Sequence, residues 1–400
     1  MKVLILAQYF PPDRGGASTR VSNVVRGLLN NGCDVTVVAA FPHYPHGQVP
    51  RKYMHKLITP ENFGKAKVLR VWIPSLPHSN AVTRSILHIS FVMSSFFALP
   101  FVNGFDLIWA ANPNMYCFYS ALVYSFIKRK PIVRNVDDLW PEVFYELGFA
   151  KSKTMRLMLD FFSRLSYVVS RLITPISVAY KHKIIEKYKI HSEKFRVVEV
   201  GVDRVEPFNS DRMKKSQFVV MYSGALGLGY DFKIVLEAAS LLSDTKDIVF
   251  VIRGFGELAP ELQKKIKFLN LSNVVLKTNF LPKDELSTLL RSADIFLLPM
   301  NPASFVDDGL PTKVFEYQAH GKPIVCSSEG EPGRYIETTM SGLVVKPGNP
   351  EIFAQAILRL YKDKKLALKL GWNGWKYVSE HLTSKKIGKR MYKVFMSARK

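Results

Sequence analysis

Residues 307–326 read Asp-Asp-Gly-Leu-Pro-Thr-Lys-Val-Phe-Glu-Tyr-Gln-Ala-His-Gly-Lys-Pro-Ile-Val-Cys, and this stretch carries the most information about the fold. The pattern predicts a loop, then a short helix with Pro311 at its first position, a stop at Gly321 and a buried strand after it. A helix N-terminus would therefore lie beside the end of a strand. Such a terminus presents unpaired N–H groups and partial positive charge, which suit a pyrophosphate.

Residues around the predicted helix start are candidates for binding phosphate. Because Pro311 has no N–H, the backbone donors that remain are Leu310, Thr312 and Lys313, with Gly309 directly before them. The Lys313 side chain can also balance phosphate charge.

Glu316 lies one turn inside the predicted helix, where its carboxylate can accept hydrogen bonds from both hydroxyls of a ribose. Together with a pyrophosphate at the helix start, this arrangement fits a sugar nucleotide. The alternative is that Asp307 or Asp308 caps an ordinary helix and that Glu316 is a solvated surface residue. Because short motifs produce false matches, other segments have to support the interpretation.

At these residues the chain resembles a known family. Asp308 and Glu316, with seven residues between them, resemble the Glu-x7-Glu signature of the family-4 retaining glycosyltransferases, with Asp in place of the first Glu. The segment 310–317 is similar to the Leu-Pro-Ser-Lys-x-x-Glu-Tyr variant of members that resemble fucosamine transferases of surface-polysaccharide synthesis. The resemblance implies that Glu316 holds the ribose and that Asp308 contacts hydroxyls of the donor sugar.

Composition indicates a globular chain with anionic partners. Its 400 residues, 48% of them apolar, suggest two domains. Lys and Arg number 56 against 33 Asp and Glu, a net charge of +23 that nucleic acid, anionic lipid or nucleotide phosphates would all complement. The cysteines Cys33, Cys117 and Cys326 resemble neither a disulfide framework nor a metal site, which indicates a reducing compartment. The first apolar run is too short for a signal peptide, so we expect a cytoplasmic protein.

Short β-branched runs alternate with helical patterns, which predicts parallel sheets covered by helices on both faces. The first series of candidate strands is Val3–Ala7, Asp34–Ala39, Ala66–Trp72, Leu107–Ala110, Ile132–Asn135, Leu172–Pro175 and Arg196–Val200. The second series is Phe218–Ser223, Ile248–Arg253, Val274–Lys277, Ile295–Pro299, Pro323–Cys326 and Gly342–Val345. The polar segment Val205–Ser216 between them is the predicted linker.

These patterns predict an α/β protein of two doubly wound, Rossmann-like domains that face a central cleft, the GT-B fold that the resemblance implies. The first domain would comprise residues 1–204 together with a C-terminal helix at 383–400. The second, which would bind the nucleotide sugar, would comprise residues 217–382.

Open α/β sheets bind ligands beyond the carboxyl ends of their strands, so the loops that follow strands are where chemistry is expected. After the first strand, Gly15 and Gly16 could let the backbone approach a phosphate or a sugar closely. Ser18 or Thr19 could cap the helix that follows.

A second loop, residues 134–142, resembles the Arg-Asp-Leu-Trp-Pro-Glu stretch of the same group. The resemblance implies that Asp138 faces the donor sugar, in a region where many family-4 members have a His. Two adjacent carboxylates, Asp137 and Asp138, are equally consistent with a helix cap.

The third loop, residues 223–231, contains Gly224 and Gly227, which could let it pass close to the donor phosphates. Many family-4 members have Arg and Lys where this chain has Ala225 and Tyr230, and those cations neutralise the pyrophosphate.

Other cations must then balance the pyrophosphate, and Lys313 and Arg253 are the candidates. Arg253 could instead pair with an acid for structural reasons. Phe280, in Asn-Phe-Leu-Pro, lies in a segment that resembles the base-binding loop.

The resemblance extends over nearly the whole chain and implies transfer of a sugar from a nucleotide-diphosphate donor, with retention at the anomeric carbon. No metal or other cofactor is expected, because a helix dipole and cations would stabilise the leaving group; His43 and His46 have no visible partners for a metal site. The alternatives are a non-hydrolysing sugar-nucleotide epimerase and a basic nucleic-acid- or membrane-binding protein without catalysis. Since no nucleic-acid motif is recognisable, no nucleic-acid partner is expected.

The acceptor is inferred from the distribution of charge and apolar residues. Positions 151–196 hold eleven basic and three acidic residues among Met, Leu and Phe, and Ile86–Val102 is strongly apolar but marginal for spanning a bilayer. This combination could seat the first domain on the anionic inner face of the cell membrane and admit a lipid-linked or glycan acceptor. The alternative is that these helices pack inward and that their lysines keep the protein soluble.

Overall fold

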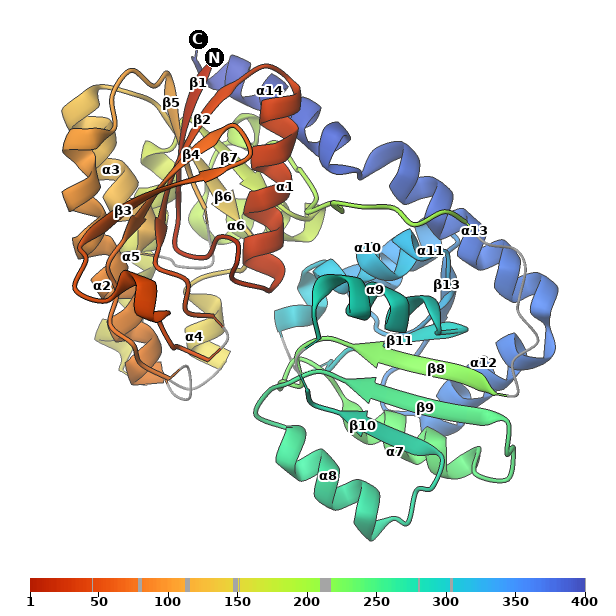
Figure 1. Ribbon diagram of the computed structural model, residues 1–400. Coiled ribbons are helices and arrows are strands. Elements are labelled where there is room, and N and C mark those ends of the chain that lie inside the picture. Colours follow the sequence, from red (N-terminus) through yellow and green to blue (C-terminus); the bar gives the residue numbers. More distant parts are fainter. Residues whose placement is uncertain are drawn as a thin grey trace. The chain divides into compact units, whose positions relative to one another are not determined.

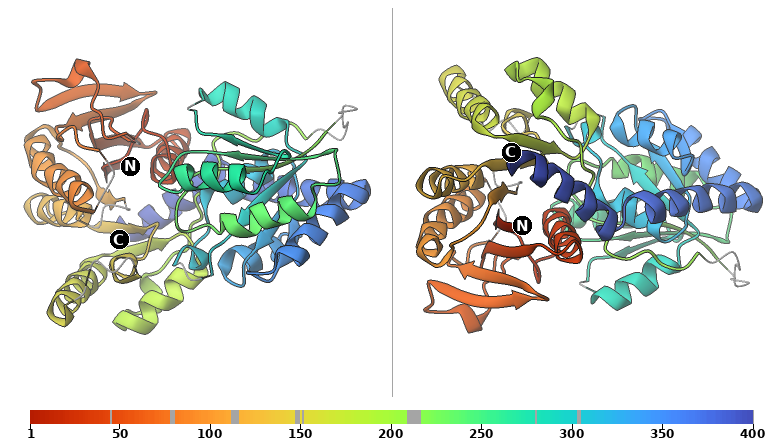
Figure 2. Two further views of the ribbon diagram at one scale, coloured as in Figure 1. Left: turned by 90° about the horizontal axis from the view of Figure 1, so that it is seen from below. Right: turned by 90° about the horizontal axis from the view of Figure 1, so that it is seen from above.

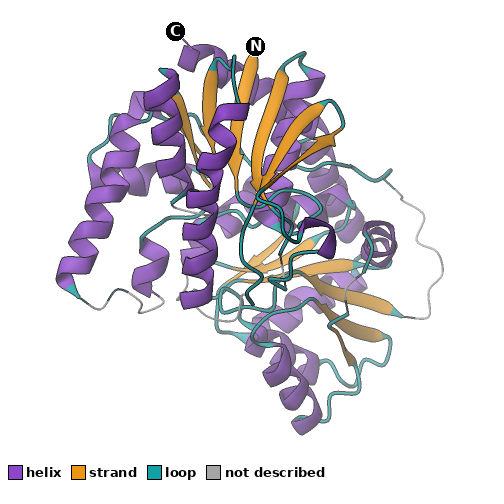
Figure 3. Cartoon of the chain, turned by 60° about the vertical axis from the view of Figure 1, so that its left-hand side comes forward, coloured by secondary structure: helices purple, strands orange, loops and turns teal. Residues whose placement is uncertain are grey.

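The computed structural model describes residues 1–44, 46–77, 81–111, 116–146, 150, 152–208, 217–279, 281–302 and 305–399. The chain divides into two compact units. Unit 1 comprises Met1–Asp203 and Ser384–Lys400, and unit 2 comprises Arg204–Thr383. In each unit a parallel or largely parallel sheet is covered by helices on both faces (Figures 1 and 3). The predicted α/β class with two doubly wound sheets is confirmed.

The described residues of unit 1 form seven strands in the order β3-β4-β2-β1-β5-β6-β7, and all neighbouring pairs are parallel except β3 with β4. The strands are β1 Lys2–Ala7, β2 Asp34–Ala40, β3 Ile58–Phe63, β4 Ala66–Val71, β5 Leu107–Ala110, β6 Ile132–Val136 and β7 Leu172–Pro175. The helices are α1 Gly16–Asn30, α2 Ala81–Ala98, α3 Cys117–Lys128, α4 Glu142–Glu146, α5 Lys153–Val169, α6 Val178–Tyr188 and α14 Ser384–Arg399. Short 3-10 turns are η1 Arg51–Tyr53, η2 Leu99–Phe101 and η3 Ser192–Lys194.

In unit 2 the part of the chain that the structure describes forms six strands, all parallel, in the order β10-β9-β8-β11-β12-β13. The strands are β8 Phe218–Ser223, β9 Ile248–Arg253, β10 Val274–Lys277, β11 Ile295–Pro299, β12 Ile324–Ser327 and β13 Gly342–Val345. The helices are α7 Phe232–Leu241, α8 Ala259–Phe268, α9 Lys283–Arg291, α10 Thr312–Ala319, α11 Glu331–Thr338, α12 Pro350–Lys362 and α13 Lys364–His381, with the 3-10 turn η4 at Phe305–Asp308.

The inner strands of unit 2 are apolar on both faces because each face packs under a layer of helices. Val220 and Leu297 belong to the core beneath α7 and α12, whereas their neighbours Met221 and Phe296 belong to the core beneath α9, α10 and α11. Successive side chains of a strand point to opposite faces, so continuous apolar runs are required here.

The sequence interpretation missed one strand of unit 1 and predicted one that does not form. β3 is an antiparallel edge strand whose residues are partly buried or exposed, and it lacks an apolar run. The predicted strand Arg196–Val200 does run beside β7, where the Arg196 N–H donates to Ile173 O at 2.9 Å and the Val198 N–H to Pro175 O at 3.0 Å. Pro175 has no N–H to donate in return, so a regular ladder cannot continue.

Each sheet has a switch point where the strand order reverses. In unit 2 the chain adds β9 and β10 on one side of β8 and then places β11 on the other side; in unit 1 the reversal lies between β1 and β5. Ligands of open α/β sheets bind beyond the carboxyl ends of the strands at such points. The loops after β8 and β11, and after β1 and β5, are therefore the places to look for sites.

Candidate functional site

The first candidate site of unit 2 is the start of α10, which follows β11 and η4. The sequence predicts Pro311 as the first helical residue, but the structure places it one residue before the helix, with an extended ψ of 135°. The Val314 N–H donates to Pro311 O at 3.0 Å, so helix geometry leaves the N–H groups of Thr312 and Lys313 without an intrahelical acceptor. Gly321 ends the helix with φ 66°, as predicted.

The structure distinguishes the two adjacent acids before this helix. Asp307 is buried, and its carboxylate accepts a hydrogen bond from the Ser328 hydroxyl, whose oxygen in turn accepts the N–H of Gly330 at 3.0 Å. Asp307 therefore fastens η4 to the start of α11. Asp308 is half-buried and lies directly before the glycine at 309. This division of roles leaves Asp308 as the better candidate for contact with a ligand.

The glycine-rich loop after β8 passes close to the loop after β9. The Gly224 N–H donates to Arg253 O at 3.0 Å, and a Cβ on Gly254 would lie 1.7 Å from Gly224 O. A Cβ on Gly256 would similarly lie 2.3 Å from Leu226 O. These two glycines of the β9 loop are thus required by a close backbone approach, which holds the β8 loop in one position.

Lys313 reaches from α10 to the β8 loop. Its amine donates to the Tyr222 hydroxyl at 2.8 Å and lies 3.4 Å from the centre of the Tyr230 ring. A Cβ on Gly224 would lie 2.5 Å from the Lys313 Cε. Burial lowers the pKa of Lys313 well below its usual value, and the charge of Glu316 opposes this effect.

Unit 2 therefore brings together most of the residues predicted to bind the donor. The residues at the helix start and in the two glycine loops are Gly309, Leu310, Thr312, Lys313, Gly224, Gly227 and Arg253. Leu310 and Arg253 are buried, whereas Glu316 is half-buried one turn along α10. Phe280 lies outside the described residues.

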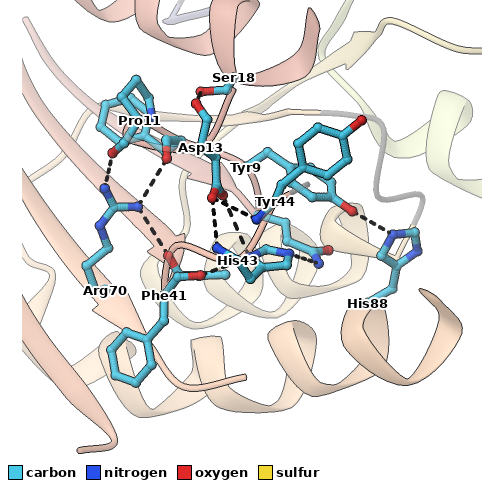
Figure 4. A network of polar contacts seen from close by, with 12 residues as sticks. Tyr9, Pro11, Asp13, Ser18, Phe41, His43, Tyr44, Arg70 and His88 are labelled. Carbon is cyan, nitrogen blue, oxygen red and sulfur yellow. Dashed lines mark hydrogen bonds and ion pairs between the residues drawn. The ribbon is translucent and has the colours of Figure 1, made fainter. Parts of the chain in front are cut away.

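In unit 1 the loop between β1 and α1 is held by the network in Figure 4. The Asp13 carboxylate accepts the backbone N–H groups of His43 at 2.8 Å and of Tyr44 at 2.9 Å. The Ser18 hydroxyl donates to Asp13 O at 2.7 Å. The predicted cap of α1 by Ser18 or Thr19 does not form, because Gly15 precedes the helix and Gly16 is its first residue.

This network also explains the position of Gly15. A Cβ on Gly15 would lie 3.1 Å from the Tyr44 ring, and the backbone φ of 140° is one that other residues rarely adopt. Burial raises the pKa of Asp13 to about 6, although the two backbone hydrogen bonds oppose the rise. The glycine pair therefore lies directly beside the hydrogen-bonded network of Asp13, with Gly15 exposed and Gly16 half-buried.

The loop after β6 contains Asp137 and Asp138, and the two carboxylates have different surroundings. Asp137 lies 3.6 Å from the guanidinium of Arg20, a fully buried residue of α1 that also donates to Asn135 Oδ1 at 3.2 Å. Burial raises the pKa of Asp138 to about 7, and the neighbouring Asp137 charge adds to the rise. Asp137 is thus the structural partner of Arg20, and Asp138 is half-buried beside it.

Metal chemistry has no visible ligand set in the described part of the chain, where no group of three or more His, Cys, Asp and Glu side chains could hold an ion. His43 Nδ1 lies 2.8 Å from Phe41 O and Nε2 lies 3.4 Å from Gln8 Nε2, so both ring nitrogens have protein neighbours.

Several residues important to these loops were missed by sequence reasoning. Tyr222 and Tyr317 appear in the sequence as ordinary buried aromatics of a strand and a helix, yet their hydroxyls hold the β8 loop. The Tyr317 hydroxyl accepts the Ser223 N–H at 2.9 Å and donates to Ser223 O at 3.0 Å. Arg20 was missed because nothing local marks it. The sequence signal that could have indicated this arrangement was Tyr230, because many family-4 members have a cation at this position.

Comparison with known families covers almost the entire chain in two adjoining parts. The family described as Glycosyltransferase Family 4 matches residues 14–206, and the family described as Glycosyl transferases group 1 matches residues 203–377. The chain is a family-4 glycosyltransferase. The predicted enzyme class is confirmed.

Curated relatives of this glycosyltransferase include two that are named for the biosynthesis of amylovoran and of colanic acid. It is 25% identical over 384 residues to the amylovoran biosynthesis glycosyltransferase AmsK of Erwinia amylovora, a match that covers 90% of each chain. It is 26% identical over 363 residues to the putative colanic acid biosynthesis glycosyl transferase WcaI of Escherichia coli K12, covering 84% of this chain and 86% of the relative.

Solved structures show the same fold at low identity. Anabaena Alr3699/HepE in complex with UDP superposes with a TM-score of 0.69 and 18% identity, covering 99% of this glycosyltransferase and 100% of that chain. Sucrose-phosphate synthase from Thermosynechococcus elongatus gives a TM-score of 0.76 with 14% identity, covering 99% and 98%. The GT-B fold is therefore confirmed.

Proposed function

We propose that this glycosyltransferase is a retaining enzyme that takes its sugar from a nucleoside-diphosphate sugar. The observation that carries the proposal is the start of α10, where free N–H groups and the Lys313 amine lie beside the glycine loop of β8 at the switch point of the sheet. A helix N-terminus with an adjacent cation stabilises the charge that develops on a departing diphosphate. Complexes of the structural relative Alr3699/HepE with UDP and with UDP-glucose are consistent with such a donor.

Each residue of the unit 2 site then has a role in the proposal. Glu316 accepts hydrogen bonds from the ribose, and Asp308 contacts hydroxyls of the donor sugar. Thr312, Lys313 and Arg253 interact with the diphosphate. In unit 1, Asp138 contacts the donor sugar, a role that rests on the family resemblance. The loop of Gly15 and Gly16 approaches a phosphate or a sugar closely.

The chemical step that we propose needs no dedicated protein base. The acceptor hydroxyl attacks the anomeric carbon on the same face from which the leaving group departs. Its proton passes to an oxygen of the departing diphosphate. One C–O bond forms as another breaks, and the configuration is retained. The role of the chain is to orient the donor and to stabilise the diphosphate.

A thermal-shift screen against uridine, guanosine and adenosine diphosphate sugars tests the donor assignment. A donor that is present at 100 times its Kd should stabilise the folded state by about 2.7 kcal/mol. Anomeric proton signals of the transfer product should show retention. If none of the donors raises the unfolding temperature, the proposed donor site is wrong, and a change in the donor sugar without any acceptor would instead indicate an epimerase.

We also propose that unit 1 binds an anionic membrane surface and that the acceptor is lipid-linked. The outer surface of α2, α3 and α5, here called the apolar face, exposes many large apolar side chains: Val82, Ile86, Ile89, Met93, Phe97, Val123, Phe126, Ile127, Met155, Leu157, Met158, Phe161 and Phe162. The three helices form one layer, since α2 packs on α3 and the Tyr119 ring of α3 lies 5.9 Å from the Phe162 ring of α5. Exposed apolar surface of this extent marks an interaction site.

The charges around the apolar face favour a bilayer as its partner. The helices and the residues that follow α3 carry Arg84, Lys128, Arg129, Lys130, Lys153, Arg156 and Arg164. The single acid among them, Asp160, is bonded to Lys187 at 2.7 Å. Apolar side chains fringed by basic residues suit the interface of an anionic membrane.

The apolar face lies on the membrane in this proposal and does not cross it. Among the described residues, the segment Val82–Phe101 is long and apolar enough to span a bilayer by length and composition, and 28% of it is buried. Leu87 and Phe91 on its inner side are fully buried in the core of unit 1. Withdrawing them would open that core, so a peripheral position on the inner face of the cell membrane is favoured. Flotation with vesicles that contain or lack anionic lipid tests this. If neither kind of vesicle carries the protein to the top of the gradient, the proposal is contradicted.

A further inference from the structure

The Lys313 amine occupies an unusual position for a cation. It lies 3.4 Å from the centre of the Tyr230 ring and 4.6 Å from that of Tyr222, and it donates one hydrogen bond, to the Tyr222 hydroxyl. Within the described residues no carboxylate approaches it within 4.0 Å. A lysine ammonium has three donors, and a buried one without an anion is costly. The two rings offset part of that cost, because the face of an aromatic ring attracts a cation.

The backbone around the amine is held by hydrogen bonds that do not involve Lys313. Tyr317 lies one turn after Lys313 on α10 and makes two hydrogen bonds to Ser223, which join the helix to the β8 loop. The Tyr222 hydroxyl donates to Ala225 O at 2.5 Å and so fixes the same loop again. The four-carbon stem of Lys313 can change rotamer without displacing this backbone, and it starts beside the N–H groups at the beginning of α10.

Gly224 provides the space in which the lysine lies. A Cβ there would lie 2.5 Å from Lys313 Cε and 2.9 Å from Nζ. Any other residue at this position would push the amine off the rings. The absence of a side chain at 224 and the two aromatic rings therefore form one device, which we call the lysine clamp: Tyr222, Gly224 and Tyr230.

We propose that the lysine clamp stores the Lys313 amine while the site is empty and releases it to the diphosphate of the donor. Tyr222 and Tyr230 are then positioning residues, and Lys313 is the cation that neutralises the leaving nucleoside diphosphate. This inference rests on the proposed function and names the source of the charge in that site. It also explains how a loop with Ala225 and Tyr230 can serve a diphosphate although it carries no cation of its own.

Ionisable groups surround the amine on each element packed against it. Tyr222 and Tyr230 face it from β8 and the following loop, and Glu316 and Tyr317 share its helix. Of these, Glu316 favours the charged amine, while burial opposes it. A bound diphosphate adds negative charge beside the amine, so binding should favour both protonation and movement toward the ligand.

Nuclear magnetic resonance of protein labelled with carbon-13 at lysine Cε tests the release directly. The Lys313 signal, assigned by its absence from Lys313→Arg, should be shifted upfield by the ring current of Tyr230 in the free protein. Saturation with UDP, GDP or ADP should move it downfield, whereas uridine, which has no phosphate, should leave it in place. The rest of the lysine spectrum reports whether each nucleotide binds.

Two variants at position 230 provide a matched pair. Tyr230→Phe keeps the ring and should keep both the upfield signal and activity. Tyr230→Leu should lose the upfield signal in the free protein and raise kcat/KM about tenfold, because a cation–π contact of roughly 1.4 kcal/mol that must be broken for release is then absent from the free enzyme.

The outcomes separate the two proposals. If a nucleotide binds but the Lys313 signal does not move, the lysine is structural and the clamp proposal is overturned. If none of the three nucleotides changes any signal, the donor site itself is wrong, and the clamp has no role. A folded Tyr230→Leu protein with unaltered kcat/KM would also overturn the clamp.

Discussion

Gly27 of α1 and Gly388 of α14 lie backbone against backbone: a Cβ on Gly27 would be 2.4 Å from the Gly388 Cα, and a Cβ on Gly388 would be 2.1 Å from the Gly27 Cα. The C-terminal helix thereby becomes part of unit 1, beside α1 (Figure 2). Glycine at both positions is needed because two helices that approach this closely have no room for side chains at the crossing.

Gly27→Ala or Gly388→Ala should destabilise unit 1 by about 1–3 kcal/mol, the usual cost of overpacking. Thermal unfolding should show the loss, and hydrogen exchange should locate it in α14. Lys389→Ala, an exposed change on the same helix, is the control and should have little effect. Equal protection of α14 in all three variants would show that the crossing tolerates a methyl group.

Glu316→Gln should weaken nucleotide binding by about 10- to 100-fold, because hydrogen bonds to a charged acceptor contribute roughly 1.5–3 kcal/mol. Calorimetry with the donor found in the screen measures this. Glu337→Gln, an exposed acid of α11, is the matched control. An unchanged affinity for Glu316→Gln would remove this residue from the site.

Asp307→Asn and Asp308→Asn should separate structure from function. Asp307 accepts the Ser328 hydroxyl, so its replacement should lower the unfolding temperature, as Ser328→Ala should. Loss of a hydrogen bond to a charged group costs about 1.5–3 kcal/mol. Asp308→Asn should lower the unfolding temperature less than Asp307→Asn does and should lower kcat/KM more. The opposite pattern would mean that the two roles are reversed.

The stability of the protein should depend on pH through Asp138, whose pKa is raised to about 7 from an ordinary value of 3.8. Between these values the unfolded chain has lost a proton that the folded chain keeps, so stability falls as pH rises from about 4 to 7. Asp138→Asn should flatten this part of the profile of unfolding temperature against pH. Asp137 and Asp13, with pKa values raised to about 6, should preserve a smaller slope. A wild-type profile with no fall in this window would contradict the assignment.

Phe126→Asp should reduce binding to anionic vesicles at least about tenfold, since burial of a Phe side chain contributes roughly 1.5–3 kcal/mol. Phe268→Asp in unit 2 is a close control, because both side chains are 85% exposed. Vesicle flotation measures the bound fraction. If the two variants lose binding equally, the apolar face is not the membrane contact.

The sequence by itself was sufficient for most of the strands, including all six of the described part of unit 2. Continuous apolar runs such as Ile295–Pro299 predicted buried parallel strands, and Gly321 predicted the end of α10 because only local geometry was involved. Loops at the strand ends followed from the same patterns. β3 was missed and the strand Arg196–Val200 was predicted wrongly, because edge pairing depends on which backbone groups of a neighbour are available.

Only the tertiary structure decided how neighbouring residues of similar chemistry differ. Asp307 and Asp308 are interchangeable in a local pattern, yet Ser328, distant in sequence, engages just the first of them. Lys313 is a phosphate candidate by position, but its place on Tyr230 depends on a loop some 80 residues earlier in the chain. The outer surface of α2 could not be recognised from composition, since its buried and exposed sides are equally apolar. Long-range packing determines these contacts, and no local pattern of residues encodes it.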